Sequence, residues 1–168
     1  MSLFHLVLLL AALARVVELM FANRNARQLF RAGAVEAGRS HYPLIVALHA
    51  TWFIAMLAMI PADAPARWPW LTLYLVLQVG RIWVLASLGR FWTTRIVTLP
   101  GAPLVRRGPY RFMRHPNYLI VELEIISLPL AFGATALAFG FGIVNAAMLW
   151  WRIRVEDQAL AARRATAQ

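Results

Sequence analysis

The stretch Leu3–Phe21 reads LFHLVLLLAALARVVELMF, a run of 19 residues of which three are polar or charged. An α-helix of that length reaches across most of the ~30 Å hydrocarbon core of a bilayer. Four further apolar stretches follow along the chain: Pro43–Ile60, Trp70–Leu88, Tyr118–Phe132 and Ala134–Trp151. Of all 168 residues 61% are hydrophobic, and the mean hydropathy is +0.63. The sequence therefore predicts an all-α integral membrane protein with about five transmembrane helices.

The chain has 17 arginines and no lysine, and the arginines are unevenly distributed among the connections between the apolar stretches. Arginines follow the first, third and fifth stretches: Arg24, Arg27, Arg31 and Arg39; Arg90, Arg95, Arg106, Arg107, Arg111 and Arg114; Arg152, Arg154, Arg163 and Arg164. The connection after the second stretch has Arg67 alone, and the turn at Gly133 has none. Because cytoplasmic loops carry an excess of arginine and lysine, we predict five crossings with the amino terminus outside. Arginine-only usage with abundant alanine indicates a GC-rich bacterial genome, and so the bacterial inner membrane.

The net charge of +10 would suit a nucleic-acid-binding protein, but such proteins gather their charge on one soluble face or helix. Since the arginines here follow the loops of one membrane side, we expect anionic lipid headgroups as partners and no nucleic acid. A cleaved signal peptide is the alternative interpretation of Met1–Ala22. Its charges, Arg15 and Glu18, come late rather than first, so we expect a retained first helix.

Metal chemistry is not expected. The chain has no cysteine, which excludes disulfides, thiolate metal sites and a cysteine nucleophile. His41 and His49 are eight residues apart and lack the i, i+4 spacing of a helical metal pair. We expect His49 to make a structural polar contact.

No repeat or domain boundary is visible, so we predict one transmembrane domain over residues 1–168. Residues 1–88 would hold three helices, and residues 89–168 a long loop, two helices and a carboxy-terminal segment. The polar segment Asn23–Ser40 is predicted to form a short amphipathic helix on the membrane surface, capped by its first residue. The connection Gly89–Asn117 is longer than the ~12 to 15 residues of ordinary loops. Its prolines exclude one long helix, and its apolar content favours a packed lid or pocket wall over disorder.

The sequence Arg114-His115-Pro116-Asn117-Tyr118 stands at the entrance to the fourth apolar stretch. A proline in this place favours the start of a helix just beyond His115, with Asn117 and Tyr118 in its first turn. One interpretation is a collar whose arginines reach the lipid phosphates and set the depth of the helix. The histidine, the tyrosine and the proline-broken backbone before them favour a ligand-binding site.

Arg152 and Glu156 follow the fifth stretch four residues apart, so they lie on one face of a helix within reach of a salt bridge. A surface ion pair of this kind contributes little to stability. The predicted topology, however, puts the pair on the same side of the membrane as His115. Two interpretations of the pair therefore remain open: an isolated ion pair, or part of a cavity wall shared with the His115 segment.

Glu122 and Glu124 lie within the fourth apolar stretch, where an unpaired carboxylate costs on the order of 3 kcal/mol. Two residues apart on a helix, they project roughly 200° apart and are not expected to face the same cavity. Either one of them pairs with Arg81 or Arg15 of a neighbouring helix, or one of them belongs to a site. The sequence leaves both alternatives open.

From about Leu88 to Leu160 the chain resembles the isoprenylcysteine carboxyl methyltransferase family of integral membrane enzymes. The matching segments are Leu104-Val105, Gly108-Pro109-Tyr110, Arg114-His115-Pro116-Asn117-Tyr118, and Arg152 with Glu156. The Arg-His-Pro-x-Tyr element joined to a downstream Arg-x-x-x-Glu is fairly specific. The same superfamily also includes phospholipid methyltransferases and membrane sterol reductases.

The resemblance implies that S-adenosylmethionine binds on the cytosolic side, between the long loop and the ends of the fourth and fifth helices. The residues that it assigns to the cofactor are Leu104, Val105, Tyr110, His115, Pro116, Asn117, Tyr118 and Glu156. Arg152 would orient the oxygen of the substrate and is the predicted catalytic residue. Methyl transfer is an in-line displacement, in which positioning supplies much of the acceleration.

These observations predict an S-adenosylmethionine-dependent O-methyltransferase that takes a lipophilic acceptor from the bilayer. For a bacterial protein of this compact type the resemblance implies a long-chain polyketide phenol or pyrone as the preferred acceptor, with an isoprenoid carboxylate as the other candidate. Three alternatives remain open: an N-methyltransferase acting on a phospholipid or another amine, a membrane sterol-type reductase, and a non-enzymatic membrane scaffold. The sequence indicates no oligomeric state.

Overall fold

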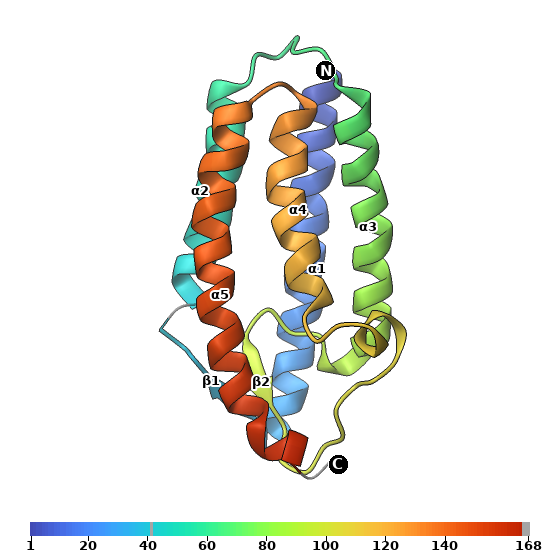
Figure 1. Cartoon of the computed structure of the whole chain (residues 1–168), viewed down its shortest axis with the longest axis vertical. Helices are drawn as coiled ribbons and strands as arrows, with labels where there is room; N and C mark the ends of the chain where they lie inside the picture. The colour runs from blue at the N-terminus through green and yellow to red at the C-terminus, as the bar shows by residue number, and fades with distance from the viewer. Residues whose placement is uncertain (41, 166–168) are drawn as a thin grey trace.

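The computed structural model describes residues 1–40 and 42–165. Five long helices run along a common axis (Figure 1): α1 (Leu3–Arg31), α2 (Tyr42–Met59), α3 (Trp68–Leu88), α4 (Pro116–Ala131) and α5 (Thr135–Ala165). Each helix overlaps one of the five apolar stretches of the sequence. The fold is therefore a helical bundle, as the composition predicts.

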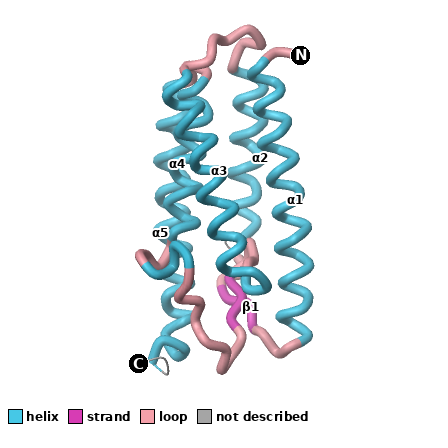
Figure 2. The backbone as a smooth tube through the Cα atoms, turned by 90° about the vertical axis from the view of Figure 1, so that its right-hand side faces the viewer, coloured by secondary structure: helices cyan, strands magenta, loops and turns pink. Residues whose placement is uncertain are grey.

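The chain alternates between the two ends of this bundle (Figure 1 and Figure 2). The amino terminus, the α2–α3 connection and the α4–α5 turn lie at one end. The ends of α1 and α5 and the long connection 89–115 lie at the other. We call this second end the arginine-rich end, because the arginines within 24–39, 90–114 and 152–154 belong to it. Alternating crossings of a membrane require such an arrangement.

Four helical segments are long and apolar enough to cross a membrane: Leu3–Arg31, Tyr42–Met59, Trp68–Phe91 and Thr135–Ala161. Large apolar side chains such as Val79 and Ile143 are exposed on the outside of the bundle, which suits contact with lipid tails. The 16 residues of α4 make a helix of about 24 Å, shorter than the ~30 Å core. The protein is an integral membrane protein, and a fifth crossing by α4 stays a prediction.

The segment after the first apolar stretch differs from its prediction. Asn23 does not cap a separate surface helix, because α1 continues without a break for 29 residues. The helix is followed by Gly33, whose φ of +88° turns the chain away. Val35–Ala37 then forms strand β1, which pairs antiparallel with β2 (Ile96–Thr98). The predicted surface helix is wrong, and this small sheet departs from a purely α-helical fold.

Asn25 explains why α1 continues. Its side chain is buried, and its amide nitrogen donates to the carbonyl oxygens of Gly89 and Trp92, at 3.0 and 2.9 Å. Both carbonyls belong to the turn after α3, where η1 (Gly89–Phe91) is a short 3-10 helix. A buried carbonyl without a donor costs about 1 to 3 kcal/mol. The last turns of α1 are therefore held by a loop that is distant in the sequence.

The connection from α3 to α4 is packed, in agreement with the prediction. Trp92, Ile96 and Pro109 are buried. Besides η1 and β2 the connection contains a second 3-10 helix, η2 (Gly108–Arg111). Figure 2 shows this connection turning back against the helix ends at the arginine-rich end. Its role in binding a cofactor stays a prediction.

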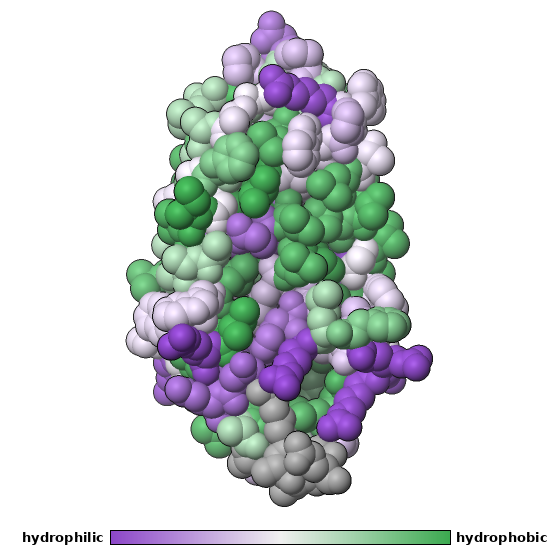
Figure 3. Space-filling model, viewed as in Figure 1, coloured by the Kyte–Doolittle hydropathy of each residue, from purple (hydrophilic) through white to green (hydrophobic). Residues whose placement is uncertain are grey.

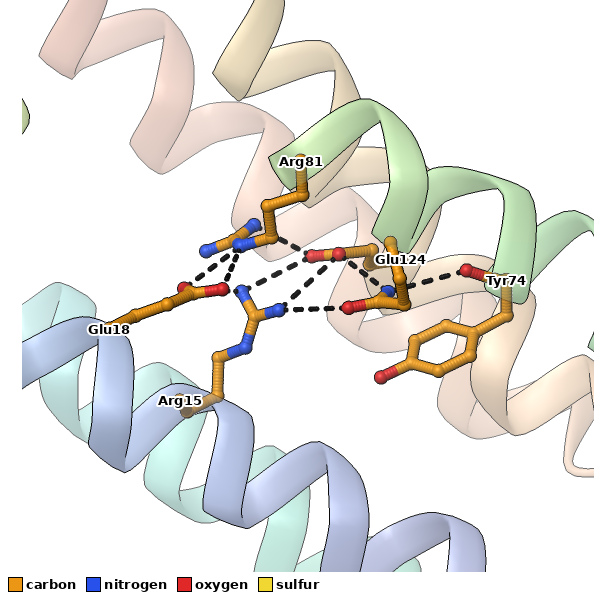
Figure 4. A network of polar contacts seen from close by, with 6 residues as sticks. Arg15, Glu18, Tyr74, Arg81 and Glu124 are labelled. Carbon is orange, nitrogen blue, oxygen red and sulfur yellow. Dashed lines mark hydrogen bonds and ion pairs between the residues drawn. The ribbon is translucent and has the colours of Figure 1, made fainter. Parts of the chain in front are cut away.

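Charged side chains from three helices meet inside the bundle (Figure 4). Arg81 of α3 donates to Glu18 of α1 at 2.7 Å and to Glu124 of α4 at 2.9 Å. Arg15 of α1 lies 3.1 Å from Glu18 and 3.4 Å from Glu124. Gln78 donates to Glu124 at 2.8 Å. Two arginines and two glutamates thus balance each other's charge inside the bundle. We call these four residues, together with Gln78, the ionic network.

The ionic network decides between the alternatives for the two glutamates of α4. Glu124 contacts both Arg81 and Arg15, so its role as a structural ion-pair partner is confirmed. Glu122 contacts neither arginine in the part of the chain that the structure describes. Its carboxylate accepts a hydrogen bond from Asn145 of α5, at 2.8 Å.

Of the two histidines near the start of the second helix, the structure describes His49. His49 lies on α2, with Nδ1 2.9 Å from the carbonyl oxygen of Ile45. This is the structural polar contact that the sequence predicts for it. His41 lies outside the described residues.

We expect Glu124→Gln to lower the free energy of unfolding by about 3 to 5 kcal/mol, because Arg15 and Arg81 would share one carboxylate inside the bundle. Glu122→Gln is the matched control on the same helix. It should cost less than about 1.5 kcal/mol, since no cation loses a partner. Unfolding by titration with dodecyl sulfate, followed by circular dichroism, measures both. Equal losses would show that charge balance is not what the network provides.

Candidate functional site

The first turn of α4 and the last part of α5 meet at the hydroxyl group of Tyr118. Nε of Arg152 donates a hydrogen bond to this hydroxyl at 2.8 Å, and the hydroxyl donates to Oε2 of Glu156. Arg152 and Glu156 are one helical turn apart, so they reach the same atom from one face of α5. The direct salt bridge that their spacing allows is absent from the described structure, because the tyrosine hydroxyl lies between them.

His115 joins this group from the start of α4. It occupies the N-cap position, and Pro116 is the first helical residue, as predicted. The His115 ring stacks on that of Tyr118, with centroids 5.3 Å apart and planes at 10°. Its Nε2 lies 3.2 Å from Oδ1 of Asp157, and its Nδ1 lies 3.9 Å from Oε2 of Glu156. We call this group the Tyr118 cluster: His115, Tyr118, Arg152, Glu156 and Asp157.

Arg152 also fixes the long loop to the helices. Its side chain is 7% exposed, and Nη2 donates to the carbonyl oxygen of Thr94 at 2.6 Å. The hydroxyl of Thr94 lies 3.1 Å from that of Tyr42 on α2. Nη1 of Arg152 makes no hydrogen bond within the described residues. The protein thus engages two of the three guanidinium nitrogens, and the third has no hydrogen-bond partner among the described residues.

Asn117 presents an acceptor without a donor. Its Oδ1 is buried and has no hydrogen-bond partner in the described part of the chain. Since buried polar atoms almost always have a partner, this oxygen is a candidate contact for a ligand. Pro116, also assigned to the cofactor by resemblance, is buried at the first position of α4. In this structure its effect is on where the helix begins.

Leu104 and Val105 lie in a different place. They line a cleft of about 440 Å³, a size typical of small-molecule pockets, together with Leu88, Arg90, Phe91, Pro103, Arg106 and Arg107. No member of the Tyr118 cluster lines this cleft. The structure therefore places the predicted site residues in two groups, at the end of α3 and between α4 and α5.

Tyr110 relates the two groups. Tyr110 and Leu88 of the cleft both pack against one buried cluster, formed by Ala22, Val84 and Trp92. Burial raises the pKa of the Tyr110 hydroxyl above its ordinary value, and the carboxylate of Glu156 raises it further. The hydroxyl therefore stays protonated at neutral pH and is available as a donor.

A close approach holds the loop against α3. Gly108 has a φ of +58°, and a Cβ at this position would overlap Oγ of Ser87 and lie 3.2 Å from Nε1 of Trp83. Nε of Arg107 donates to the carbonyl oxygen of Ser87 at 2.8 Å. Both the backbone conformation and the space require glycine here.

Three contacts of the site were not predicted. Asp157 had a signal, because it is a carboxylate beside Glu156 in the sequence. Asn25 lay in a segment that was interpreted as a surface helix. Thr94 acts through its carbonyl oxygen, which every residue has, so no sequence pattern points to it.

Comparison with known proteins assigns the family. The model of the isoprenylcysteine carboxyl methyltransferase (ICMT) family matches residues 70–162, which include the Tyr118 cluster and the cleft. The chain belongs to the ICMT family. Members of this family are in general S-adenosylmethionine-dependent methyltransferases, and membership points to a membrane methyltransferase. The resemblance that the sequence motifs indicate is confirmed.

Two relatives extend the similarity over most of the chain. The uncharacterized protein YpbQ of Bacillus subtilis (strain 168) is 40% identical over 162 residues, which cover 94% of this chain and 96% of YpbQ. An uncharacterized protein of Haemophilus influenzae is 26% identical over 157 residues, 87% of this chain and 88% of that protein. No solved structure gives a significant match. Since the alignment covers 94% of the chain, the similarity to YpbQ extends over most of α1 and α2, both of which lie before the family match that begins at residue 70.

We expect Gly108→Ala to loosen the loop from α3, because the added Cβ meets Ser87. Gly101→Ala is the matched control: Gly101 also has a positive φ, of +74°, but nothing lies within 4 Å of an added Cβ. The measurement is the rate of tryptic cleavage after the loop arginines in detergent-solubilised protein. Cleavage should be several-fold faster in Gly108→Ala than in Gly101→Ala, and Ser87→Gly should partly reverse the effect. Similar rates in the two alanine variants would refute the close approach.

Proposed function

We propose that this protein is an S-adenosylmethionine-dependent O-methyltransferase that methylates a lipophilic acceptor at the arginine-rich end, on the cytosolic side of a bacterial inner membrane. The observation that carries the proposal is the Tyr118 hydroxyl, which contacts both Arg152 and Glu156. Through this atom the two separated motifs of the family form one group of side chains.

The groups around Tyr118 fit S-adenosylmethionine. The carboxylates of Glu156 and Asp157 suit its sulfonium and amino groups, and the His115 ring, stacked on Tyr118, offers an aromatic face to a cation. Oδ1 of Asn117 has no donor among the residues that the structure describes and suits the amino group of the adenine. Bound in this way, S-adenosylmethionine supplies an electrophilic methyl group.

The cleft supports the same assignment. Leu104 and Val105 provide apolar contacts, while the arginines among its lining residues suit the carboxylate of the cofactor. Tyr110 shares a buried cluster with Leu88 of the cleft, and the charge of Glu156 acts on its hydroxyl. We propose that the cofactor site extends from the Tyr118 cluster toward this cleft.

Arg152 is the proposed catalytic residue. Contacts with Tyr118 and Thr94 hold its guanidinium rigidly and leave Nη1 without a partner in the described structure. A fixed cation where negative charge develops lowers the barrier of a reaction. In this proposal Nη1 binds the acceptor oxygen and stabilises it as it becomes an oxyanion.

The same cation favours an oxygen acceptor over an amine. An amine becomes positively charged as it is methylated, and a guanidinium within a few ångströms opposes that charge. This argument favours a long-chain phenol or pyrone, or an isoprenoid carboxylate, over a phospholipid amine. The exposed apolar faces of the bundle are consistent with entry of the acceptor from the bilayer.

Titration with S-adenosylhomocysteine tests the cofactor. We expect the detergent-purified protein to bind it in calorimetry and His115→Ala to weaken binding at least about tenfold, since one aromatic face and its polar contacts are lost. His49→Ala is the matched control, because His49 makes a local helix contact, and it should bind like the wild type. No binding by the folded wild type at millimolar ligand would rule out the methyltransferase proposal.

Arg152→Lys tests the catalytic role. Lysine keeps the charge but not the planar fork, so we expect turnover to fall by about 100-fold or more while S-adenosylhomocysteine still binds. Turnover is measured with methyl-labelled cofactor and a long-chain alkylphenol, and mass spectrometry distinguishes a methyl ether from a methylated amine. Wild-type turnover in this variant would refute the role of Arg152.

A further inference from the structure

Glu122 is a carboxylate within α4 that the ionic network does not use. It is half-buried, and it accepts a hydrogen bond from Asn145, whose side chain is 1% exposed. Within the described residues no arginine or histidine lies within ion-pair distance of Glu122. An unpaired carboxylate in hydrocarbon costs on the order of 3 kcal/mol. Unlike Glu124, it is not explained by charge balance.

Glu122 lies next to the proposed site. Tyr118 precedes it by four residues, so their Cβ atoms lie about 5 to 6 Å apart on one face of α4. Asn145 precedes Arg152 by seven residues, which is about two turns along one face of α5. The contact between Glu122 and Asn145 therefore lies in the same interface between α4 and α5 as the contact between Tyr118 and Arg152. We call this interface the α4–α5 seam. The Glu122 contact is one to two turns farther from the arginine-rich end.

The seam leaves room for this carboxylate. A Cβ at Gly142 of α5 would lie 3.0 Å from the side chain of Ile126 and 3.5 Å from Oε1 of Glu122. Glycine thus lets the carboxylate lie close to the backbone of α5. Figure 3 shows a small hydrophilic patch at mid-height, surrounded by apolar surface, on the face that α4 and α5 form, above the largely hydrophilic arginine-rich end. An acceptor that enters from the bilayer along this face would pass Glu122 on its way to Arg152.

We infer that Glu122 is the general base for an acceptor with an un-ionised hydroxyl, such as a phenol or an enol, and that Asn145 positions its carboxylate. This inference rests on the proposed function. The hydroxyl proton passes to Glu122, and the freed electron pair of the oxygen forms the bond to the methyl carbon. The carbon–sulfur bond breaks, and its electron pair stays on sulfur in S-adenosylhomocysteine. The proton on Glu122 returns to water after the product leaves.

The carboxylates of the Tyr118 cluster are less suited to this role. Glu156 and Asp157 lie where the proposal puts the sulfonium, and a neighbouring cation makes a carboxylate a weaker base. Glu156 also accepts the hydroxyl proton of Tyr118 in a hydrogen bond. Glu122 has one neutral donor, Asn145, and its other oxygen, beside Gly142, has no protein donor in the described structure.

Binding without turnover tests the contact. The protein, saturated with S-adenosylhomocysteine in detergent, is titrated by calorimetry with dodecylphenol and, at mildly alkaline pH, with its ionised nitro derivative. Glu122→Gln should weaken dodecylphenol binding about tenfold, because a hydrogen bond to a charged acceptor is lost. The same change should strengthen binding of the nitrophenolate, because a like charge is removed. The methyl ether of dodecylphenol has no proton to give and should bind equally to both proteins.

Turnover tests the proton transfer. For dodecylphenol, Glu122→Gln should lower kcat by about 100-fold or more, the size typical of lost general base catalysis. For the ionised nitro derivative kcat should change little, because no proton has to be removed. Asn145→Ala should show the same pattern with a smaller loss, and Glu122→Asp should recover part of the activity of Glu122→Gln. A structural role for Glu122 would affect both phenols alike.

The outcomes separate this inference from the function on which it rests. If the wild type and Glu122→Gln bind and methylate both phenols equally, the role of Glu122 is overturned while the methyltransferase stands. If the wild type fails to bind S-adenosylhomocysteine, the proposed function itself fails. If it binds that molecule but methylates neither phenol, the acceptor class and the base are both wrong. Should Glu122→Gln be unstable, the role of Glu122 is decided with Asn145→Ala and Glu122→Asp, by comparing their turnover of dodecylphenol with their turnover of the ionised nitro derivative.

Discussion

Lipid offers no hydrogen bonds, so a protein must satisfy every charge that it places within the hydrocarbon core. Here the contacts of Arg81 with Glu18 and Glu124 meet that requirement by joining α1, α3 and α4. Separating these charges without water is costly, which fixes the relative positions of the three helices. Because Glu124 fixes α4, it also fixes Tyr118, which lies six residues earlier on the same helix, about 9 Å along its axis.

The arginine-rich end depends on a second set of contacts, made by helix ends with the long loop. Asn25 holds the turn after α3, Gly108 allows the loop to approach Ser87, and Arg152 binds Thr94. Each contact joins a helix to a backbone or side-chain atom of the loop. The loop is therefore shaped by the bundle, and the site assembles only when both are in place.

Two glutamates separated by one residue illustrate how environment assigns different roles to the same side chain. Helix geometry turns Glu122 and Glu124 roughly 200° apart. Glu124 meets two arginines and an amide, whereas Glu122 meets one amide on the α4–α5 seam. Ion pairing accounts for the first. No cation of the described residues pairs with the second, which lies beside the place where, in our proposal, a hydroxyl reacts.

The sequence by itself determined the membrane class, the five helical stretches, the side on which the arginines gather and the family, because hydrophobicity, length and short motifs are local properties. It also predicted that a helix begins directly after His115. Only the tertiary structure decided that α1 continues past Asn23, that Glu124 rather than Glu122 pairs with the arginines, and that a tyrosine hydroxyl separates Arg152 from Glu156. These outcomes depend on contacts between residues far apart in the chain, which helical periodicity and spacing do not encode.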